Sequence, residues 1–327
     1  MDSEAPLVSE GPPSVRRRGG LADLVRLARP RQWTKNAVCF AALVFAGRLG
    51  DPTAVGPAVL IFVTFCLTSS TVYIINDLFD RAEDRAHPVK AGRALAAGRV
   101  AVGAALVEMA LLAAGAIALS VFLVPRARAV LAAYLLLNLG YSAGLKRVAI
   151  LDVMLIALGF VLRVQAGIEA IRARQSAWII LTMFFMALFL GFAKRRGELG
   201  VSPGSAARAH RALLGVYSVA FLDVVLAVSA TTALVCYALY AVTVQPNEAF
   251  LVTVLPVVFG IVRYMMLVLV RERQEDPDEL LTRDGPLVVA ILIWAALSIA
   301  VLYLDLHLVP DAAVFPPAED VPIYGPP

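Results

Sequence analysis

Apolar runs of membrane-spanning length dominate this chain. They lie at 36–47, with an extension back to Trp33, and at 54–75, 100–124, 129–145, 150–170, 176–193, 213–243, 249–270 and 286–304. A helix of about 20 apolar residues spans the roughly 30 Å of hydrocarbon in a bilayer. The sequence therefore predicts an all-α, polytopic membrane protein with nine transmembrane helices.

The composition excludes an ordinary soluble domain. Hydrophobic residues make up 60% of the chain and charged residues 17%, whereas soluble domains carry about 25% charged residues. Each of the three cysteines lies inside an apolar run, without paired spacing or a neighbouring histidine. This pattern argues against both a disulfide framework and a zinc site.

Lysine and arginine concentrate on one side of the predicted membrane. Most of the 29 such residues precede the first run or lie in the loops after the second, fourth, sixth and eighth runs. The positive-inside rule places these segments in the cytoplasm. We therefore expect a multi-pass protein of the plasma (inner) membrane, with its N-terminus and active site cytoplasmic. The net charge of +4 reflects this topology, and we expect no nucleic-acid partner.

Polar segments divide the chain into three parts. Residues 1–20 and the Pro-rich residues 309–327 lack apolar periodicity, and we expect two disordered tails. Residues 21–308 form the predicted transmembrane domain. The charged segments that we expect to form cytoplasmic cap loops, and to carry the chemistry, are 76–99, 140–152 and 194–212.

An acidic motif follows directly on the second apolar run. It consists of Asn76, Asp77, Asp80 and Asp84. If the helix continues through it, the aspartates stand at i, i+3 and i+7 and share one face. Mg²⁺ prefers oxygen ligands and commonly joins one or two carboxylates to phosphate oxygens, so the motif predicts a site for Mg²⁺ and a diphosphate. The alternative is a solvated, acidic helix end.

Cationic residues flank this motif in the predicted topology. Gly144 is expected to end the fourth helix and to free Lys146 and Arg147 to meet an anion. Tyr141 and Asp152 lie beside them in sequence. Alone, the two cations would equally fit the positive flank of a membrane helix, but beside an acidic motif they favour phosphate binding.

Two further segments add cations on the same side. The loop 194–212 contains Lys194, Arg195 and Arg211, and no aspartate. Lys35 follows Gln32 near the start of the first helix, and its apolar stem allows its charge to reach the cytoplasmic surface. These residues are further candidates for phosphate binding.

Four charged residues lie within apolar runs, where charges are costly and are therefore candidates for function. Arg163 and Arg263 are candidates for meeting a phosphate or a carboxylate in a central cavity. Glu108 and Asp223 fit simple pairing with a neighbouring helix as well.

Three motifs together resemble one known family. They are Asn76-Asp77-x-x-Asp80-x-x-x-Asp84, Arg29-Pro30…Lys35-Asn36 and Tyr141…Lys146-Arg147. With them, the chain from Arg29 to about residue 304 resembles the UbiA superfamily of intramembrane prenyltransferases. The resemblance implies nine helices around a central cavity open to the cytoplasm, with Mg²⁺ and a diphosphate leaving group at the acidic motif.

One departure narrows this resemblance. Aromatic prenyltransferases of the superfamily carry a second aspartate-rich motif after the sixth helix. In this chain the loop at the same place, residues 194–212, contains no aspartate. This loop and the 141–152 segment resemble the decaprenyl-phosphate phosphoribosyltransferase branch. That resemblance implies transfer of 5-phosphoribosyl from phosphoribosyl pyrophosphate to decaprenyl (polyprenyl) phosphate, with release of pyrophosphate. The product would be the precursor of the arabinose donor for arabinogalactan cell walls.

The resemblance also implies roles for the candidate residues. Asp77 and Asp80 would hold Mg²⁺, or Mn²⁺ in its place, with Asp84 and Asn76 in support. The phosphates of the donor and the lipid would meet polar residues from several segments, namely Gln32, Lys35, Tyr141, Lys146, Arg147, Asp152, Arg163, Lys194, Arg195 and Arg211.

Two alternatives to this function stay open. The first is a UbiA-type enzyme that moves a prenyl group from a prenyl diphosphate to an aromatic acceptor. The second is a transporter, against which the concentration of ionisable residues at one face argues. Membrane lipids are expected partners, and small residues on the helix faces permit close packing between protomers. A homo-oligomer, with a trimer as one form, is therefore among the expected assemblies.

Overall fold

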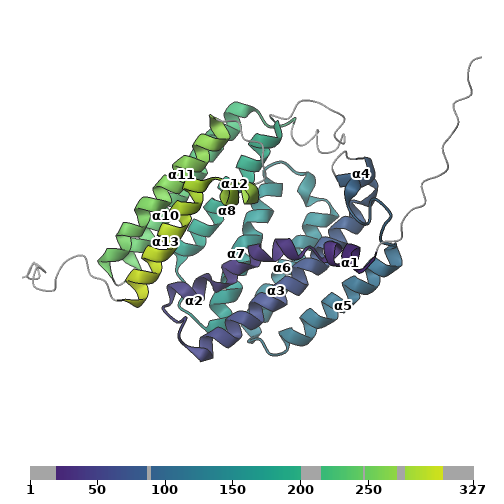
Figure 1. Ribbon diagram of the computed structural model, residues 1–327, viewed down its shortest axis with the longest axis horizontal. Coiled ribbons are helices and arrows are strands. Elements are labelled where there is room, and N and C mark those ends of the chain that lie inside the picture. Colours follow the sequence, from purple (N-terminus) through teal and green to yellow (C-terminus); the bar gives the residue numbers. More distant parts are fainter. Residues whose placement is uncertain (1–19, 87–89, 200–214, 246, 271–276, 305–327) are drawn as a thin grey trace, which may run out of the picture.

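The computed structural model describes residues 20–86, 90–199, 215–245, 247–270 and 277–304. Within these ranges the chain forms helices joined by turns, and no strand (Figure 1). The predicted tails lie outside the described residues, apart from Gly20 at the end of the first tail.

Short elements open the chain and long helices follow; η marks a 3₁₀-helix. The N-terminal part contains α1 (Leu21–Ala28), η1 (Pro30–Phe40), α2 (Ala41–Phe45), α3 (Pro52–Phe79), α4 (Arg81–Ala86), η2 (Lys90–Gly92), α5 (Val102–Ser120), α6 (Pro125–Ala143), η3 (Leu145–Arg147) and α7 (Leu151–Ile171). The C-terminal part contains α8 (Ala177–Leu199), α10 (Val219–Thr243), η4 (Glu248–Thr253), α11 (Val254–Leu269), α12 (Pro277–Arg283) and α13 (Gly285–Tyr303).

Seven helical segments among the described residues are long and apolar enough to cross a membrane: α3, α5, α7, α8, α10, η4 with α11, and α13. The chain is therefore a multi-pass, all-helical membrane protein, as its apolar runs predict. The other two predicted spans correspond to η1 with α2 and to α6, whose first turn carries Arg126 and Arg128. The count of nine crossings stays a prediction.

The first apolar run does not form a plain α-helix. It starts as η1, a 3₁₀-helix of 11 residues, although 3₁₀ runs beyond 3–4 residues are uncommon. Two contacts with α7 hold η1. Nε of Arg163 donates to Asn36 Oδ1 at 2.7 Å. Gly167 approaches Cys39 so closely that a Cβ at position 167 would lie 2.0 Å from the Cys39 carbonyl oxygen.

Helix α7 joins two groups of helices (Figure 1). It packs against α3 and α6 in one group, where α5 covers α3, and against α8 in the other, where α8 packs against α10 and α11 packs against α13. Both interfaces are apolar. Phe65 and Tyr134 are buried in the first group, and Val153, Phe189 and Leu226 are buried in the second.

Consecutive long helices run in alternating directions. The C-terminal ends of α3, α6 and α8 therefore meet the N-terminal ends of α7 and α10 at one end of the bundle. Helix α4 continues from α3 at this end, and η2 packs against α4. We call this end of the bundle the site end, because it carries the acidic motif from Asn76 to Asp84.

The close approach of η1 to α7 predicts that Gly167→Ala destabilises the fold. Insertion of a methyl group into a filled space costs about 1–3 kcal/mol, and more where backbone must shift. Gly103→Ala is the matched control, because nothing lies within 4 Å of the Cβ that it would add to α5. The apparent Tm in detergent measures the difference between the variants. Equal Tm values would contradict the contact.

Candidate active site

The acidic motif lies at the junction of α3 and α4. Helix α3 ends at Phe79, Asp80 forms its C-cap, and α4 starts at Arg81. The Asp84 N–H donates to the Asp80 carbonyl oxygen at 2.8 Å, so the helical path continues through the motif nearly as the sequence predicts. Asp77 and Asp84 are each only 3% exposed. Buried carboxylates are costly unless cations pair with them.

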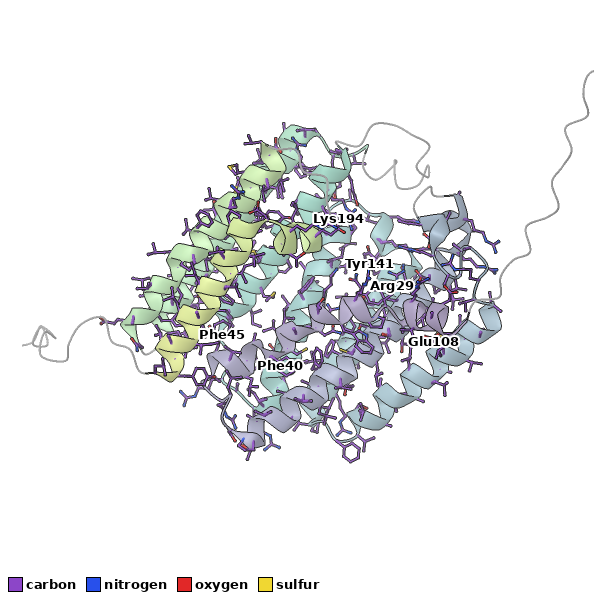
Figure 2. The ribbon with its side chains drawn as sticks, viewed as in Figure 1. Arg29, Phe40, Phe45, Glu108, Tyr141 and Lys194 are labelled. Atoms are coloured by element: carbon purple, nitrogen blue, oxygen red, sulfur yellow. The ribbon has the colours of Figure 1, made fainter. Side chains whose placement is uncertain are left out.

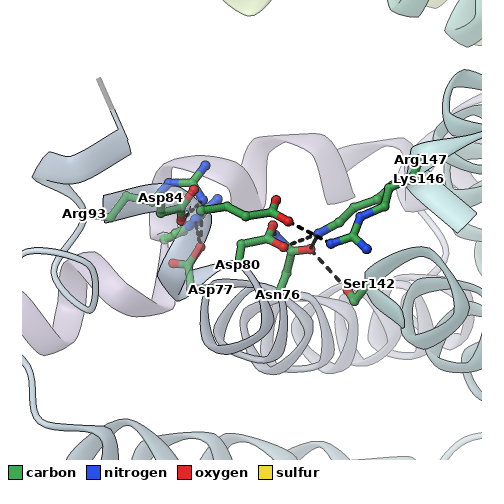
Figure 3. A network of polar contacts seen from close by, with 10 residues as sticks. Asn76, Asp77, Asp80, Asp84, Arg93, Ser142, Lys146 and Arg147 are labelled. Carbon is green, nitrogen blue, oxygen red and sulfur yellow. Dashed lines mark hydrogen bonds and ion pairs between the residues drawn. The ribbon is translucent and has the colours of Figure 1, made fainter. Parts of the chain in front are cut away.

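One arginine joins Asp77 to Asp84. Nη1 of Arg93, just after η2, lies 3.1 Å from Asp77 Oδ1 and 2.7 Å from Asp84 Oδ2 (Figure 3). Arg29 also pairs with Asp77 through Nη2, and its guanidinium lies 5.1 Å from the centroid of the Tyr73 ring. Arg29 has the left-handed φ of 52° between α1 and η1, and this turn places its side chain against the motif.

Asp80 and Asn76 meet a different cation. Lys146 pairs with Asp80 through Nζ and donates to Asn76 Oδ1 at 3.1 Å. Asn76 donates to Asp80 Oδ2 at 3.0 Å, and Ser142 donates to Asn76 Oδ1 at 3.2 Å. Figure 3 shows this group beside the pair that Arg93 joins. The motif therefore divides its carboxylates between two sets of cations.

Gly144 brings Lys146 and Arg147 to the motif. Helix α6 ends at Ala143, and Gly144 follows with φ 150°, a conformation that residues with a Cβ rarely adopt. The chain then forms η3, which carries both cations. Arg147 pairs with the partly exposed Glu83 at 2.7 Å. The predicted end of the fourth helix at Gly144 is thus confirmed.

Asp152 and Arg195 form a buried ion pair at the site end. Asp152 is fully buried, and its Oδ2 lies 2.9 Å from Arg195 Nε and 2.8 Å from Nη2. Arg195 also donates to Glu198 at 2.7 Å. The Tyr217 hydroxyl donates to Asp152 Oδ1 at 3.3 Å and accepts from the Ile150 N–H. Since φ 69° is strained for the β-branched Ile150, this network holds the turn before α7.

Burial changes the pKa of two groups near the motif. It raises the pKa of Asp84 above its ordinary value, and the neighbouring Arg93 acts against this rise. Burial lowers the pKa of Lys90, and the charge of Arg93 adds to this effect. The carboxylates of Asp84, Asp80 and Glu198 act on Lys90 in the opposite direction.

The chemistry of the motif suits a divalent cation. Its carboxylates and the Asn76 amide oxygen are hard oxygen ligands of the kind that Mg²⁺ takes. Within the described ranges, however, no three His, Cys, Asp or Glu side chains come together closely enough to hold a metal ion. Binding of an ion by several of these carboxylates therefore requires that Arg93 or Lys146 gives up its present contacts.

Arg163 lies midway along α7 and is only 5% exposed. Its guanidinium donates to Asn36 Oδ1 and to the Tyr134 hydroxyl, both at 2.7 Å, and to the Gly159 carbonyl oxygen at 3.0 Å. It also stacks over the Tyr134 ring at 4.7 Å. These contacts join η1, α6 and α7 inside the bundle.

The remaining sequence candidates lie on several elements. Gln32 and Lys35 are partly buried in η1, Tyr141 is partly buried near the end of α6, and Lys194 is exposed near the end of α8. Figure 2 labels Tyr141 and Lys194. Arg211 lies outside the described residues.

Two of the intramembrane charges pair with neighbouring helices. Asp223 of α10 accepts from Arg196 of α8 at 2.9 Å, which confirms the expected pairing. Arg263 makes two contacts with Asp284, before α13, at 3.0 and 2.8 Å, so it meets a carboxylate. Glu108 Oε2 in α5 is buried without a hydrogen-bond partner among the described residues.

Sequence reasoning did not select Arg29, Arg93, Ser142 or Tyr217 as site residues. Arg29 had a signal, because the following Pro30 suits a helix start and places Arg29 in the preceding turn. Arg93 is one of several cations in the loop 76–99, and nothing local distinguishes it from the others. Tyr217 meets Asp152 only through the packing of distant segments.

An apolar cavity of about 300 Å³ lies between α8, α10, α11 and α13. Its lining includes Leu281 and Leu287 toward the site end, and Phe45, Tyr237 and Trp294 deeper in the bundle. The Tyr237 hydroxyl accepts from Trp294 Nε1 at 2.8 Å. The walls of the cavity suit a hydrocarbon chain.

Known proteins resemble this chain in sequence and in fold. The family described as the UbiA prenyltransferase family matches residues 37–283. The chain is 34% identical to the decaprenyl-phosphate phosphoribosyltransferase of Mycolicibacterium smegmatis, over 92% of this chain and 98% of that protein. It is 32% identical to the protein of the same name from Mycobacterium tuberculosis, over 84% and 93%. A UbiA homologue from Archaeoglobus fulgidus, solved with GPP and Mg²⁺, has the same fold, with a TM-score of 0.64 and 19% identity over 86% of this chain and 99% of that chain.

The buried pair predicts that Asp152→Asn destabilises the protein strongly. Removal of the Asp152 charge leaves the buried Arg195 with Glu198 as its remaining carboxylate partner, and loss of one partner of a buried pair costs up to about 3–5 kcal/mol. Asp223→Asn is the matched control, because Asp223 also pairs with an arginine of α8 but has 39% of its side chain exposed. We expect a clearly larger loss of apparent Tm in detergent for Asp152→Asn. Equal losses would show that the buried pair contributes no special stability.

Proposed function

Because the chain belongs to the UbiA prenyltransferase family, we propose that it transfers 5-phosphoribosyl from phosphoribosyl pyrophosphate to decaprenyl phosphate, or a similar polyprenyl phosphate, and releases pyrophosphate. The observation that carries this proposal is the similarity, over 92% of the chain, to a relative named decaprenyl-phosphate phosphoribosyltransferase. The loop 194–212, which lacks aspartate, argues against a second acidic motif of the kind expected for aromatic prenyl transfer.

The cations at the site end are consistent with the binding of several phosphate groups in one site. The donor carries a 5-phosphate and a diphosphate, and the acceptor carries a lipid phosphate. Four cations from three segments lie around the acidic motif: Arg29, Arg93, Lys146 and Arg147 pair with its carboxylates or with Glu83. This density of cations fits a substrate pair with three anionic groups, because each phosphate requires charge-assisted hydrogen bonds.

We assign divalent metal binding to Asp77 and Asp80, with Asp84 and Asn76 in support, and Mg²⁺ or Mn²⁺ as the ion. When bound, the ion stabilises the negative charge that develops on the departing pyrophosphate. Lys146 and Arg147 then bind phosphate oxygens of the donor, and the exposed Lys194 offers a further cation.

The acceptor needs little activation by the protein. A lipid phosphate is already anionic at neutral pH, so its oxygen attacks C1 of the ribose without a strong general base. Attack from the face opposite the pyrophosphate inverts C1. Lys35 and Gln32 of η1 are our candidates for holding the lipid phosphate. Asp152 is fully buried, so we assign it a positioning role through Arg195 and not a contact with substrate.

The apolar cavity offers a place for part of the lipid tail. It extends from Leu281 and Leu287, at the site end, into the bundle, so a lipid with its phosphate at the site end would have its tail beside or within the cavity. The soluble donor requires a site end that faces the cytoplasm, in agreement with the distribution of Lys and Arg. We place the protein in the plasma membrane, where its product would supply arabinan synthesis for the cell wall.

The proposal predicts Mg²⁺-dependent transfer of label from [¹⁴C]phosphoribosyl pyrophosphate to decaprenyl phosphate by the purified protein. Asp77→Asn and Asp80→Asn should each lower the rate at least about 100-fold, since each removes a group that stabilises charge on the leaving pyrophosphate. Asp51→Asn is the matched control, because Asp51 caps the opposite end of α3, and we expect it to retain the rate.

Organic extraction separates the labelled lipid from the donor. Absence of labelling by the folded wild-type protein would contradict the proposal. Transfer from a prenyl diphosphate to an aromatic acceptor would instead support the alternative enzyme.

A further inference from the structure

A single atom of Arg93 contacts two buried carboxylates. Its Nη1 lies 3.1 Å from Asp77 Oδ1 and 2.7 Å from Asp84 Oδ2 (Figure 3). The two aspartates come from successive helices, α3 and α4, and both are 3% exposed. Without a cation between them, like charges this close would repel each other in a poorly hydrated site. Arg93 thus lies between two carboxylate oxygens, where a divalent cation would also relieve the repulsion.

The environment of Arg93 allows it to leave this position. Its side chain is 28% exposed, whereas those of Asp77 and Asp84 are 4% and 5% exposed. It follows η2, a short element that packs against α4, and it is not part of a membrane-spanning helix. Asp77 keeps a second cationic partner, Arg29. Movement of Arg93 therefore requires a change only in the cap loop 76–99.

We propose that Arg93 is an exchangeable counter-cation, which holds Asp77 and Asp84 together in the unliganded protein and moves to phosphate oxygens of the donor when a divalent cation takes its place. The inference rests on the proposed function, because it concerns the same metal and the same donor. Arginine suits both positions, since its guanidinium pairs with carboxylates and phosphates in similar geometry. The exchange keeps positive charge beside the carboxylates as the negative donor arrives.

An exchangeable cation and a merely structural one predict different effects of substitution. If Arg93 competes with the metal, its removal strengthens metal binding by the protein without donor. The same removal weakens binding of the donor in the presence of metal, because a phosphate loses its partner. If Arg93 only holds the cap segment in place, its removal weakens both.

The test compares Arg93→Gln with the wild-type full chain in detergent. Electron paramagnetic resonance measures the Kd of Mn²⁺ without donor, and radiolabelled phosphoribosyl pyrophosphate measures the Kd of the donor with Mg²⁺. We expect Arg93→Gln to bind Mn²⁺ about 10-fold more tightly and the donor about 10-fold more weakly, changes that correspond to roughly 1.4 kcal/mol each.

Arg85→Gln is the matched control. Arg85 lies on α4, is exposed, and donates to the Ala96 carbonyl oxygen at 3.2 Å, so its removal changes the charge of the same region without a contact to Asp77 or Asp84. We expect both dissociation constants of this variant to stay within about 2-fold of the wild type, because exposed charges interact weakly over distance.

Four results would overturn the exchange. Weaker or unchanged Mn²⁺ binding by Arg93→Gln would give Arg93 a structural role or none. Equal effects of Arg85→Gln and Arg93→Gln would attribute them to net charge. Wild-type protein that binds Mn²⁺ but never the donor would overturn the proposed function, and the exchange with it. Wild-type protein that binds both, with no change in Arg93→Gln, would overturn the exchange alone.

Discussion

Charge compensation of buried carboxylates governs the site end. Asp77, Asp84 and Asp152 are almost fully withdrawn from solvent, and a buried carboxylate stays ionised only beside cations or hydrogen-bond donors. The structure supplies Arg93 to the first two and Arg195 to the third. Because these cations come from cap segments and from α8, the same pairs that neutralise the carboxylates also fix how the segments are arranged around them.

Helix α7 connects this chemistry to the rest of the fold. Its first turn carries Asp152, which receives Arg195 and Tyr217. Farther along, Arg163 and Gly167 hold η1 through Asn36 and the Cys39 carbonyl. One helix thus fixes both the start of the first apolar segment, which carries Lys35, and the turn that follows Lys146. The positions of Lys35 and Lys146, both candidates for phosphate binding, therefore depend on specific side-chain contacts along α7.

The sequence predicted what depends on local pattern. Apolar length indicated the spans, the spacing of Asp77, Asp80 and Asp84 indicated a shared helical path, and Gly144 marked the end of α6. It did not predict which cation meets which carboxylate, because Arg93 and Lys146 reach the motif through loop geometry. The sequence also did not predict the 3₁₀ form of η1, which depends on close contact with a helix more than 120 residues away in the chain.

A structure of the protein with Mg²⁺ and phosphoribosyl pyrophosphate would test the central claim most directly, namely that the acidic motif and its cations form a donor site. The account predicts the ion against Asp77 and Asp80, with Asp84 in support and Arg93 displaced, and the pyrophosphate of the donor against Lys146 at the site end. A donor bound at the opposite end of the bundle, or bound at the site end with the Asp80–Lys146 pair intact and no ion beside Asp77, would contradict it.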